Sequence, residues 1–284
     1  MRLGRQKNTS GQAVLIVLLS LSVVLIIVLY IMSRSVTDLS LSSKEEDSLR
    51  AFSAAEAGVE RALVLGPTGP LEIGGASFEA DVSSFGQGET SVVYPVSLKS
   101  GEIATFWFAP HVGVLGDQQF SGGSLTLCWG DEGTAVDANS PAIEFTVYYG
   151  PVDSLSIARI TIDPYQARPN GGSSNSFVAT DNGTCTIGNE IFEFRKTIDL
   201  TLDMAIADLS SLQYGNARIL YNTSVAHKVG IDVSGVGILP SQGSRVISSG
   251  SFGGANRKIE VYETHKVVPP IFENSIFSSN GIVK

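Results

Sequence analysis

The chain has 284 residues and a formal net charge of −9, which is enough length for one large domain or two small ones. The charge is unevenly distributed, because residues 66–284 carry 12 Lys and Arg against 22 Asp and Glu, whereas residues 1–11 are basic. An acidic exterior repels the phosphates of nucleic acids, so the composition argues against a nucleic-acid partner.

The only segment of membrane length lies near the start of the chain. Ala13–Met32 contains no charged residue, no proline and no glycine, and as a helix it would span about 30 Å, the thickness of a bilayer core. Its polar side chains, Ser20, Ser22 and Tyr30, can each bond within their own helix or lie near an interface. Basic residues precede the segment, which predicts a single-pass protein of the cytoplasmic membrane with its N-terminus inside and the remainder exported. A cleaved signal peptide fits less well, because its apolar region would be only about 7–15 residues long.

The helix is expected to continue beyond this segment. No Pro or Gly occurs from Gln12 to Ala57, and Gly66-Pro67 gives a clear stop. In the second half, apolar residues recur at steps of three and four, which predicts one stripe that lies against a folded domain. The stripe consists of Leu49, Phe52, Ala55, Val59 and Ala62. We therefore predict one helix over residues 12–65, apolar all round in its first half and amphipathic in its second.

The remainder of the chain has the pattern of a β protein. Segment 142–149, AIEFTVYY, alternates apolar and polar side chains, as a half-buried strand does. Similar but weaker segments are separated by clusters of Gly, Asn, Asp and Pro, and no long helical pattern lies between them. This order predicts the fold class α+β, with a long N-terminal helix followed by a predominantly antiparallel β domain.

The two cysteines, Cys128 and Cys185, both lie in the β-rich region and are far apart in sequence. Their spacing excludes a CxxC redox motif and a zinc knuckle. If this region is exported, it enters an oxidising compartment, and a disulfide between the two is the favoured interpretation. Two independent buried thiols are the alternative.

No residue pattern indicates catalysis or a cofactor. Three possible calcium ligands, Asp131, Asp137 and Asn139, do not match the spacing of a known calcium loop. No phosphate-binding loop, nucleophile elbow or dinucleotide fingerprint occurs. The histidines are far apart and lack metal-ligand spacing, which predicts structural or surface roles for them; they are His111, His227 and His265. We expect no enzyme activity, no cofactor and no metal site.

Two stretches of the chain carry a resemblance to a known family. The first runs from the basic leader MRLGRQKNTSG into QAVLIVLLSLS and returns in AFSAAEAGVERAL, residues 51–63. The second is SRVISSGSFGGANRKIEVYET, residues 244–264, in which Ser249-Gly250 would close one strand and Arg257 would open the next after a glycine-rich turn. Together they resemble type IV pilin-like proteins, and most of all the PilX-type minor pilins.

The resemblance implies processing followed by assembly. In this family a prepilin peptidase cuts on the cytoplasmic side after the leader glycine, which here falls between Gly11 and Gln12. The apolar segment then stays on the mature protein, first as a membrane anchor and later as the packing core of a filament. The expected parts are a leader over residues 1–11, the helix over 12–65 and an exported β-rich domain over 66–284.

One position departs from the family pattern. Most pilins have a glutamate as the fifth mature residue, an acid thought to pair with the N-terminal amine of a neighbouring subunit. Counted from Gln12, that position here is Ile16. Some minor pilins and the K-type pseudopilin of type II secretion also lack this acid, so the departure favours a minor, tip-located subunit. The residues expected to pack helices are Ile16, Leu49, Phe52, Ala55 and Val59.

The leading interpretation is a minor pilin-like subunit of a type IV pilus or related secretion filament, initiating or capping its tip. Its partners would be other pilins and minor pilins, the prepilin peptidase and the inner-membrane assembly platform, and it would reach the pilus or the cell surface after assembly. The alternative is a membrane-anchored surface protein whose β domain acts as an adhesin or ligand-binding module. An anchored hydrolase is a third interpretation, although no nucleophile or pair of acids stands out.

Overall fold

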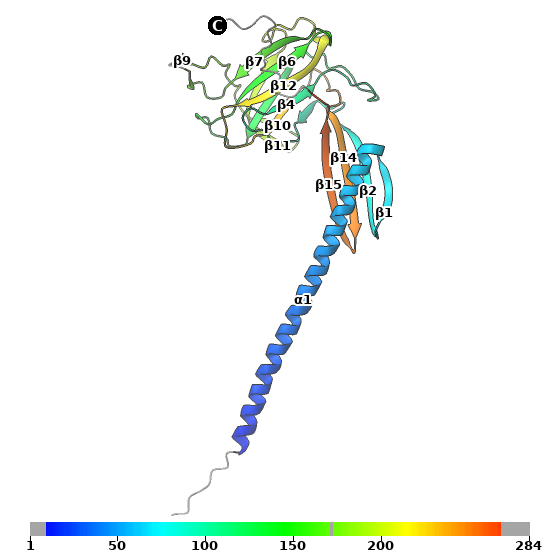
Figure 1. The fold of residues 1–284 in the computed structure, drawn as a ribbon. Helices are drawn as coiled ribbons and strands as arrows, with labels where there is room; N and C mark the ends of the chain where they lie inside the picture. Colours follow the sequence, from blue (N-terminus) through cyan, green and yellow to red (C-terminus); the bar gives the residue numbers. More distant parts are fainter. Residues whose placement is uncertain (1–9, 171–172, 268–284) are drawn as a thin grey trace, which may run out of the picture. The chain divides into compact units, whose positions relative to one another are not determined.

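The computed structural model describes residues 10–170 and 173–267, which form one long helix followed by β-sheets (Figure 1). The predicted α+β class is confirmed. The elements in chain order are α1 (Ser10–Leu65), β1 (Thr68–Ile73), β2 (Ala76–Phe85), β3 (Ser91–Val93), β4 (Ile103–Trp107), β5 (Ser124–Asp131), β6 (Ala142–Tyr149), β7 (Ser156–Ile162), β8 (Pro169–Asn170), β9 (Ser173–Ser174), β10 (Cys185–Ile187), β11 (Glu190–Asp199), the short 3-10 helix η1 (Leu209–Ser211), β12 (Leu212–Leu220), β13 (Val229–Asp232), β14 (Gly243–Phe252) and β15 (Ala255–Thr264).

The chain divides into two compact units. The first comprises residues 1–82 and 246–261, and the second comprises residues 83–245 and 262–284. The first unit therefore contains α1 and most of the four-stranded sheet β1-β2-β14-β15. Residues 66–82 and 246–261 are distant in sequence, yet both belong to the unit of the helix because they pack on its amphipathic half.

Helix α1 ends where the sequence predicts. Gly66 adopts a left-handed backbone conformation with φ of 83°, and its N–H donates to the carbonyl oxygen of Ala62 at 2.9 Å. Glycine takes this conformation at little steric cost and so caps the carbonyl end of a helix. The following Pro67 has no N–H with which to continue the helical ladder. The last helical residue is Leu65, as predicted.

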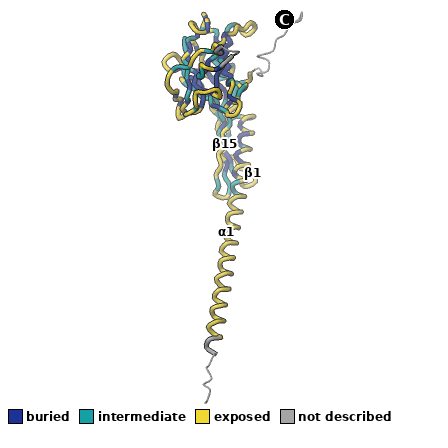
Figure 2. Tube along the Cα trace, turned by 90° about the vertical axis from the view of Figure 1, so that its left-hand side faces the viewer, coloured by how far each residue is buried: buried dark blue, intermediate teal, exposed yellow. Residues whose placement is uncertain are grey.

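The amphipathic half of α1 buries a narrow stripe of small side chains against the sheet (Figure 2). Opposite it, β2 contributes apolar side chains that include Phe78 and Ala80, and β14 contributes Val246. Strand β14 approaches the helix backbone closely, because a Cβ added at Gly250 would lie 2.1 Å from the carbonyl oxygen of Ala51. The buried helical residues are Ala51, Ala54, Ala55, Gly58, Val59 and Ala62.

The predicted docking stripe is correct for Ala55, Val59 and Ala62 and wrong for Leu49 and Phe52. These two side chains remain 63% and 43% exposed. The physical reason is position around the helix: the docked face is centred on Ala51 and Ala55, where Gly250 meets the helix backbone. At 3.6 residues per turn, Leu49 lies nearly opposite Ala51 and Phe52 lies at the margin of the docked face.

The second unit contains two larger sheets, the five-stranded β10-β11-β5-β13-β3 and the four-stranded β4-β12-β6-β7. Side chains from both sheets form one apolar core, with Trp129 of β5 and Phe145 of β6 among its fully buried members. Indole Nε1 of Trp129 donates to the carbonyl oxygen of Pro141 at 2.8 Å, so its one polar group is satisfied in the interior.

The strand predicted over residues 142–149 is present as β6, with the same ends. It is, however, more than half-buried, because Thr146 and Tyr148 on its predicted polar face are also covered. The ring of Tyr214 stacks on Tyr148 with centroids 4.5 Å apart, and Nε of Arg159 donates to Oγ1 of Thr146 at 3.2 Å. Its neighbours β12 and β7 thus cover the face that alternation alone assigns to solvent.

Cys128 and Cys185 form the predicted disulfide. It joins β5 to β10, two strands of the same sheet that are separated by β11, and their Cα atoms lie 5.9 Å apart. This distance is possible because the sheet curls until its two edge strands, β10 and β3, make contact. Both cysteines are buried in a small apolar cluster with Phe192.

We expect loss of this disulfide to destabilise the second unit. In the chain-entropy model, the 57-residue separation corresponds to about 3–4 kcal/mol. Urea unfolding of the detergent-solubilised chain, with and without reductant, measures the difference, and the double variant C128A/C185A should be insensitive to reductant. Thiol labelling after denaturation without reductant provides the check, since two labelled thiols per wild-type chain would contradict the assignment.

Candidate assembly surface

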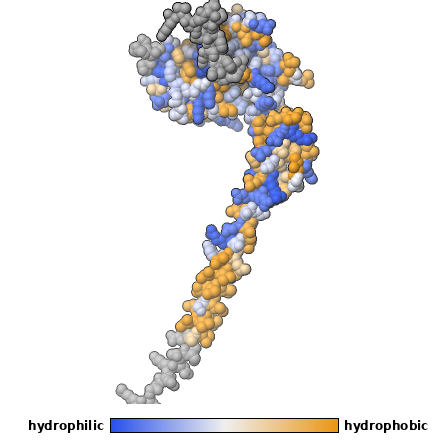
Figure 3. Space-filling model, viewed as in Figure 1, coloured by the Kyte–Doolittle hydropathy of each residue, from blue (hydrophilic) through white to orange (hydrophobic). Residues whose placement is uncertain are grey.

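The first half of α1 presents an apolar surface, of which Figure 3 shows one face. Its large apolar side chains from Val14 to Met32 are between 46% and 66% exposed. The segment is long and apolar enough to cross a membrane, and none of its most apolar window is buried in the structure. Apolar surface of this extent is unfavourable in water. Lipid or other apolar helices would satisfy it.

Two serine hydroxyls within this surface bond to carbonyl oxygens of the same helix. Ser20 Oγ donates to the carbonyl oxygen of Val17 at 2.9 Å, and Ser22 Oγ donates to that of Leu18 at 2.8 Å. The predicted bonding of these hydroxyls within their own helix is thus confirmed. A helix that satisfies its own backbone and hydroxyl groups can enter hydrocarbon without unpaired donors.

Ile16, predicted to occupy the position of the family acid, lies on this surface and is 61% exposed. The first acidic side chain after it is Asp38, well beyond the apolar segment. Gly11 and Gln12, the predicted cleavage pair, lie in the first turn of α1. Residues 1–9, most of the predicted leader, lie outside the described residues.

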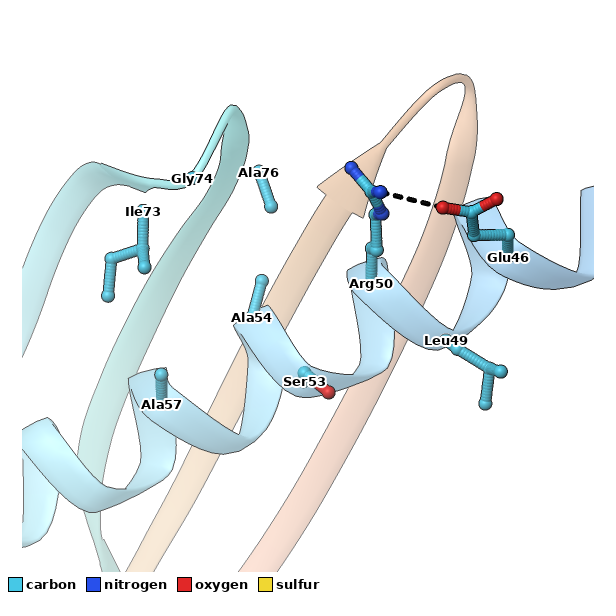
Figure 4. Close-up of a pocket in the computed structure, with 9 residues that line it drawn as sticks. All are labelled: Glu46, Leu49, Arg50, Ser53, Ala54, Ala57, Ile73, Gly74 and Ala76. Carbon is cyan, nitrogen blue, oxygen red and sulfur yellow. Dashed lines mark hydrogen bonds and ion pairs between the residues drawn. The ribbon is translucent and has the colours of Figure 1, made fainter. Parts of the chain in front are cut away.

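A shallow groove of about 390 Å³ runs beside the docked half of the helix (Figure 4). Its helical wall carries Leu49 and Arg50, and its other wall carries Ile73 at the end of β1. Oε1 of Glu46 accepts from Nη2 of Arg50 at 2.6 Å, and the guanidinium carbon of Arg50 lies 4.8 Å from the ring centroid of Phe252. The ion pair is exposed and adds little stability. Its main effect is to hold Arg50 over the aromatic ring.

The hairpin predicted near the C-terminus is present, with shifted ends. Strand β14 continues past Gly250 to Phe252, and β15 begins at Ala255, so that Arg257 is inside the second strand. The extension places Phe252 against the cluster formed by Ala54 and Phe78. Nε of Arg257 donates to Oγ of Ser48 at 2.8 Å, which is a second polar attachment of this hairpin to the helix.

Within the described residues, no group of three or more His, Cys, Asp or Glu is arranged to hold a metal ion. Asp131, Asp137 and Asn139 line a common hollow of about 320 Å³. His227 in the same hollow is buried, and its Nε2 lies 2.8 Å from Nδ2 of Asn222, in agreement with the predicted structural role.

The structure places two histidines in contact that the sequence did not predict to be neighbours. The rings of His111 and His265 stack with centroids 3.4 Å apart. No spacing rule signals this pair, because one residue follows β4 and the other follows β15.

No protein-family model matches this chain, and a comparison with curated proteins finds no significantly similar sequence.

Proposed function

We propose that this protein is a minor pilin-like subunit that assembles through its N-terminal helix into a type IV pilus or a related secretion filament. The observation that carries the proposal is the difference between the two halves of α1. One continuous helix of 56 residues has an uncovered apolar first half, while its second half is docked on a folded sheet. The resemblance of segments 51–63 and 244–264 to PilX-type minor pilins supports the same function.

The uncovered half serves both stages of such a life cycle. Before assembly it would anchor the subunit in the cytoplasmic membrane, with the β units exported. After prepilin peptidase cuts between Gly11 and Gln12, the same surface would pack against the helices of other pilins. The partners are therefore those pilins, the peptidase and the assembly platform of the inner membrane.

Ile16 supports a place at the tip. Packing apolar helices side by side buries each N-terminal amine, and an unpaired buried ammonium is strongly unfavourable. A subunit below another would need an acid to meet that amine, and Ile16 offers none. A subunit at the top has no neighbour above it, so the missing acid carries no penalty there.

N-terminal mass spectrometry of the chain purified from its native membrane tests the processing step. A mature chain beginning at Gln12 supports the proposal. A chain beginning at Met1 would instead support the alternative of an uncleaved, membrane-anchored surface adhesin or ligand-binding protein, and a chain beginning after Met32 would contradict both.

Because Leu49 is exposed, a variant at this position can test assembly without disturbing the fold. We expect Leu49→Gln to change the free energy of unfolding by no more than about 0.5 kcal/mol, because the side chain is mostly solvated. The same change at the fully buried Ala55 should lower stability by about 1–3 kcal/mol through overpacking. If Leu49 contacts a neighbouring subunit, its variant should fold normally yet be depleted from sheared filaments. Undiminished incorporation would remove Leu49 from the assembly surface.

A further inference from the structure

A pair of stacked imidazoles closes one edge of a cavity in the second unit. The rings of His111 and His265 lie nearly parallel, at an interplanar angle of 11°. Trp107 packs edge-on against His111, with ring centroids 4.5 Å apart. The cavity has a volume of about 600 Å³ and is lined by both histidines, by Trp107 and by the charged residues Glu263 and Lys266.

The stack joins two segments that are distant in sequence. His111 belongs to the loop after β4, and His265 is the first residue after β15. The N–H of His265 donates to the carbonyl oxygen of Gln242 at 3.3 Å, and Nε2 of His265 lies 3.3 Å from Oγ of Ser241. Both of these contacts are 3.3 Å long, and the ring stack with His111 is a further attachment of His265.

The groups around His111 and His265 favour protonation of one ring over protonation of both. Asp117 is the nearest acid, with Oδ2 at 4.0 Å from Nδ1 of His111. Both of its oxygens already accept backbone hydrogen bonds, from His111 at 2.8 Å and from Ser241 at 2.7 Å. Glu263 adds a second negative charge beside His265, whereas Lys266 adds a positive one at the same cavity. Two imidazolium rings in contact would repel each other across a few ångströms.

We propose that His111 and His265 form an acid-operated clasp, which holds residues 265–267 on the loop after β4 at neutral pH and releases them when both rings are protonated. The clasp is independent of the filament proposal, since it depends only on contacts within the second unit.

The direction of the pH effect follows from the environment of each ring. Burial lowers the pKa of His111 below 6.5, and the neighbouring His265 lowers it further, while Asp117 acts in the opposite direction. Burial also lowers the pKa of His265, against the opposing effects of Asp117 and Glu263. Because the closed state binds these protons less readily than the open state, the clasp is fully closed above 6.5 and weakens as the pH falls below it.

Hydrogen exchange of the backbone amide of His265 in the full chain in detergent tests the proposal, once corrected for the intrinsic pH dependence of exchange. Between about pH 7.5 and about pH 5, its protection should fall several-fold, because the open state binds protons more readily than the closed state. The double variant H111F/H265F keeps two stacked rings but cannot be protonated. Its protection should change by less than about twofold over the same range.

Two results would overturn the clasp. The first comes from hydrogen exchange at His265: protection that falls equally with pH in the wild type and the double variant, or protection that does not change with pH in the wild type. The other comes from NMR titration of the wild-type imidazole signals and does not depend on the variant folding: histidines 111 and 265 that both titrate at or above 6.5 would show that the stack does not resist protonation.

Discussion

The variant Gly250→Val should separate the C-terminal hairpin from the helix and destabilise the first unit by about 3 kcal/mol or more. Valine is a good strand residue, so the loss does not come from strand propensity. It comes from the close approach of β14 to α1, where a Cβ at position 250 would lie 2.1 Å from the carbonyl oxygen of Ala51 and 2.5 Å from the nitrogen of Ala55. Backbone atoms cannot rotate away, so the two elements must move apart.

A matched variant in the same sheet controls for the effect of adding a side chain. Gly69 lies in β1, and a Cβ there would meet nothing within 4 Å. Gly69→Val should therefore leave stability nearly unchanged. Hydrogen exchange of the amides around Ala55 and Val246 reports the docking directly. Equal protection of these amides in the two variants would show that the close approach at Gly250 is not essential for docking.

Leu21→Arg should abolish membrane retention of the unassembled chain. Leu21 lies near the middle of the apolar segment and is exposed, so its replacement would place a charge at the centre of the bilayer. That position costs about 2.5–3.5 kcal/mol on insertion scales. Fractionation of cells that lack the other filament components measures retention without a contribution from assembly.

Two further variants test whether the loss of membrane retention depends on the depth of the charge in the bilayer. Leu21→Val keeps the segment apolar and should be retained at the wild-type level. Val14→Arg places the same charge near the end of the segment, where a long side chain can reach the interface, so it should be retained better than Leu21→Arg. Wild-type retention of Leu21→Arg would mean that Ala13–Met32 is not the anchor.

The elements with strong local signals were predictable from the sequence. Gly66-Pro67 predicted the end of α1 because a left-handed cap followed by a residue without an N–H acts within a single turn. The alternation in AIEFTVYY predicted both ends of β6. The disulfide followed from two cysteines in one β-rich region, although nothing in the sequence indicated that the sheet curls enough to join β5 to β10.

Features set by contacts distant in sequence were not predictable. Which face of α1 docks depends on where β14 approaches the helix, and only the position of Gly250 against Ala51 shows why Leu49 and Phe52 are left outside. The cover over Thr146 and Tyr148 depends on neighbouring strands. The pairing of His111 with His265 likewise depends on how the ends of β4 and β15 meet, and no periodicity within either segment encodes it.

Imaging of single filaments tests whether this protein lies at the tip of a filament. A small label on an exposed loop of the second unit, such as the turn at Gly133, where the structure leaves open space, would mark the protein in filaments sheared from wild-type cells. We expect label at one end of each filament and loss of that label when Leu21→Arg replaces the wild type. Label confined to the cell envelope, with unlabelled filaments, would contradict a place in the extruded filament, and label spread evenly along the shaft would contradict the tip position.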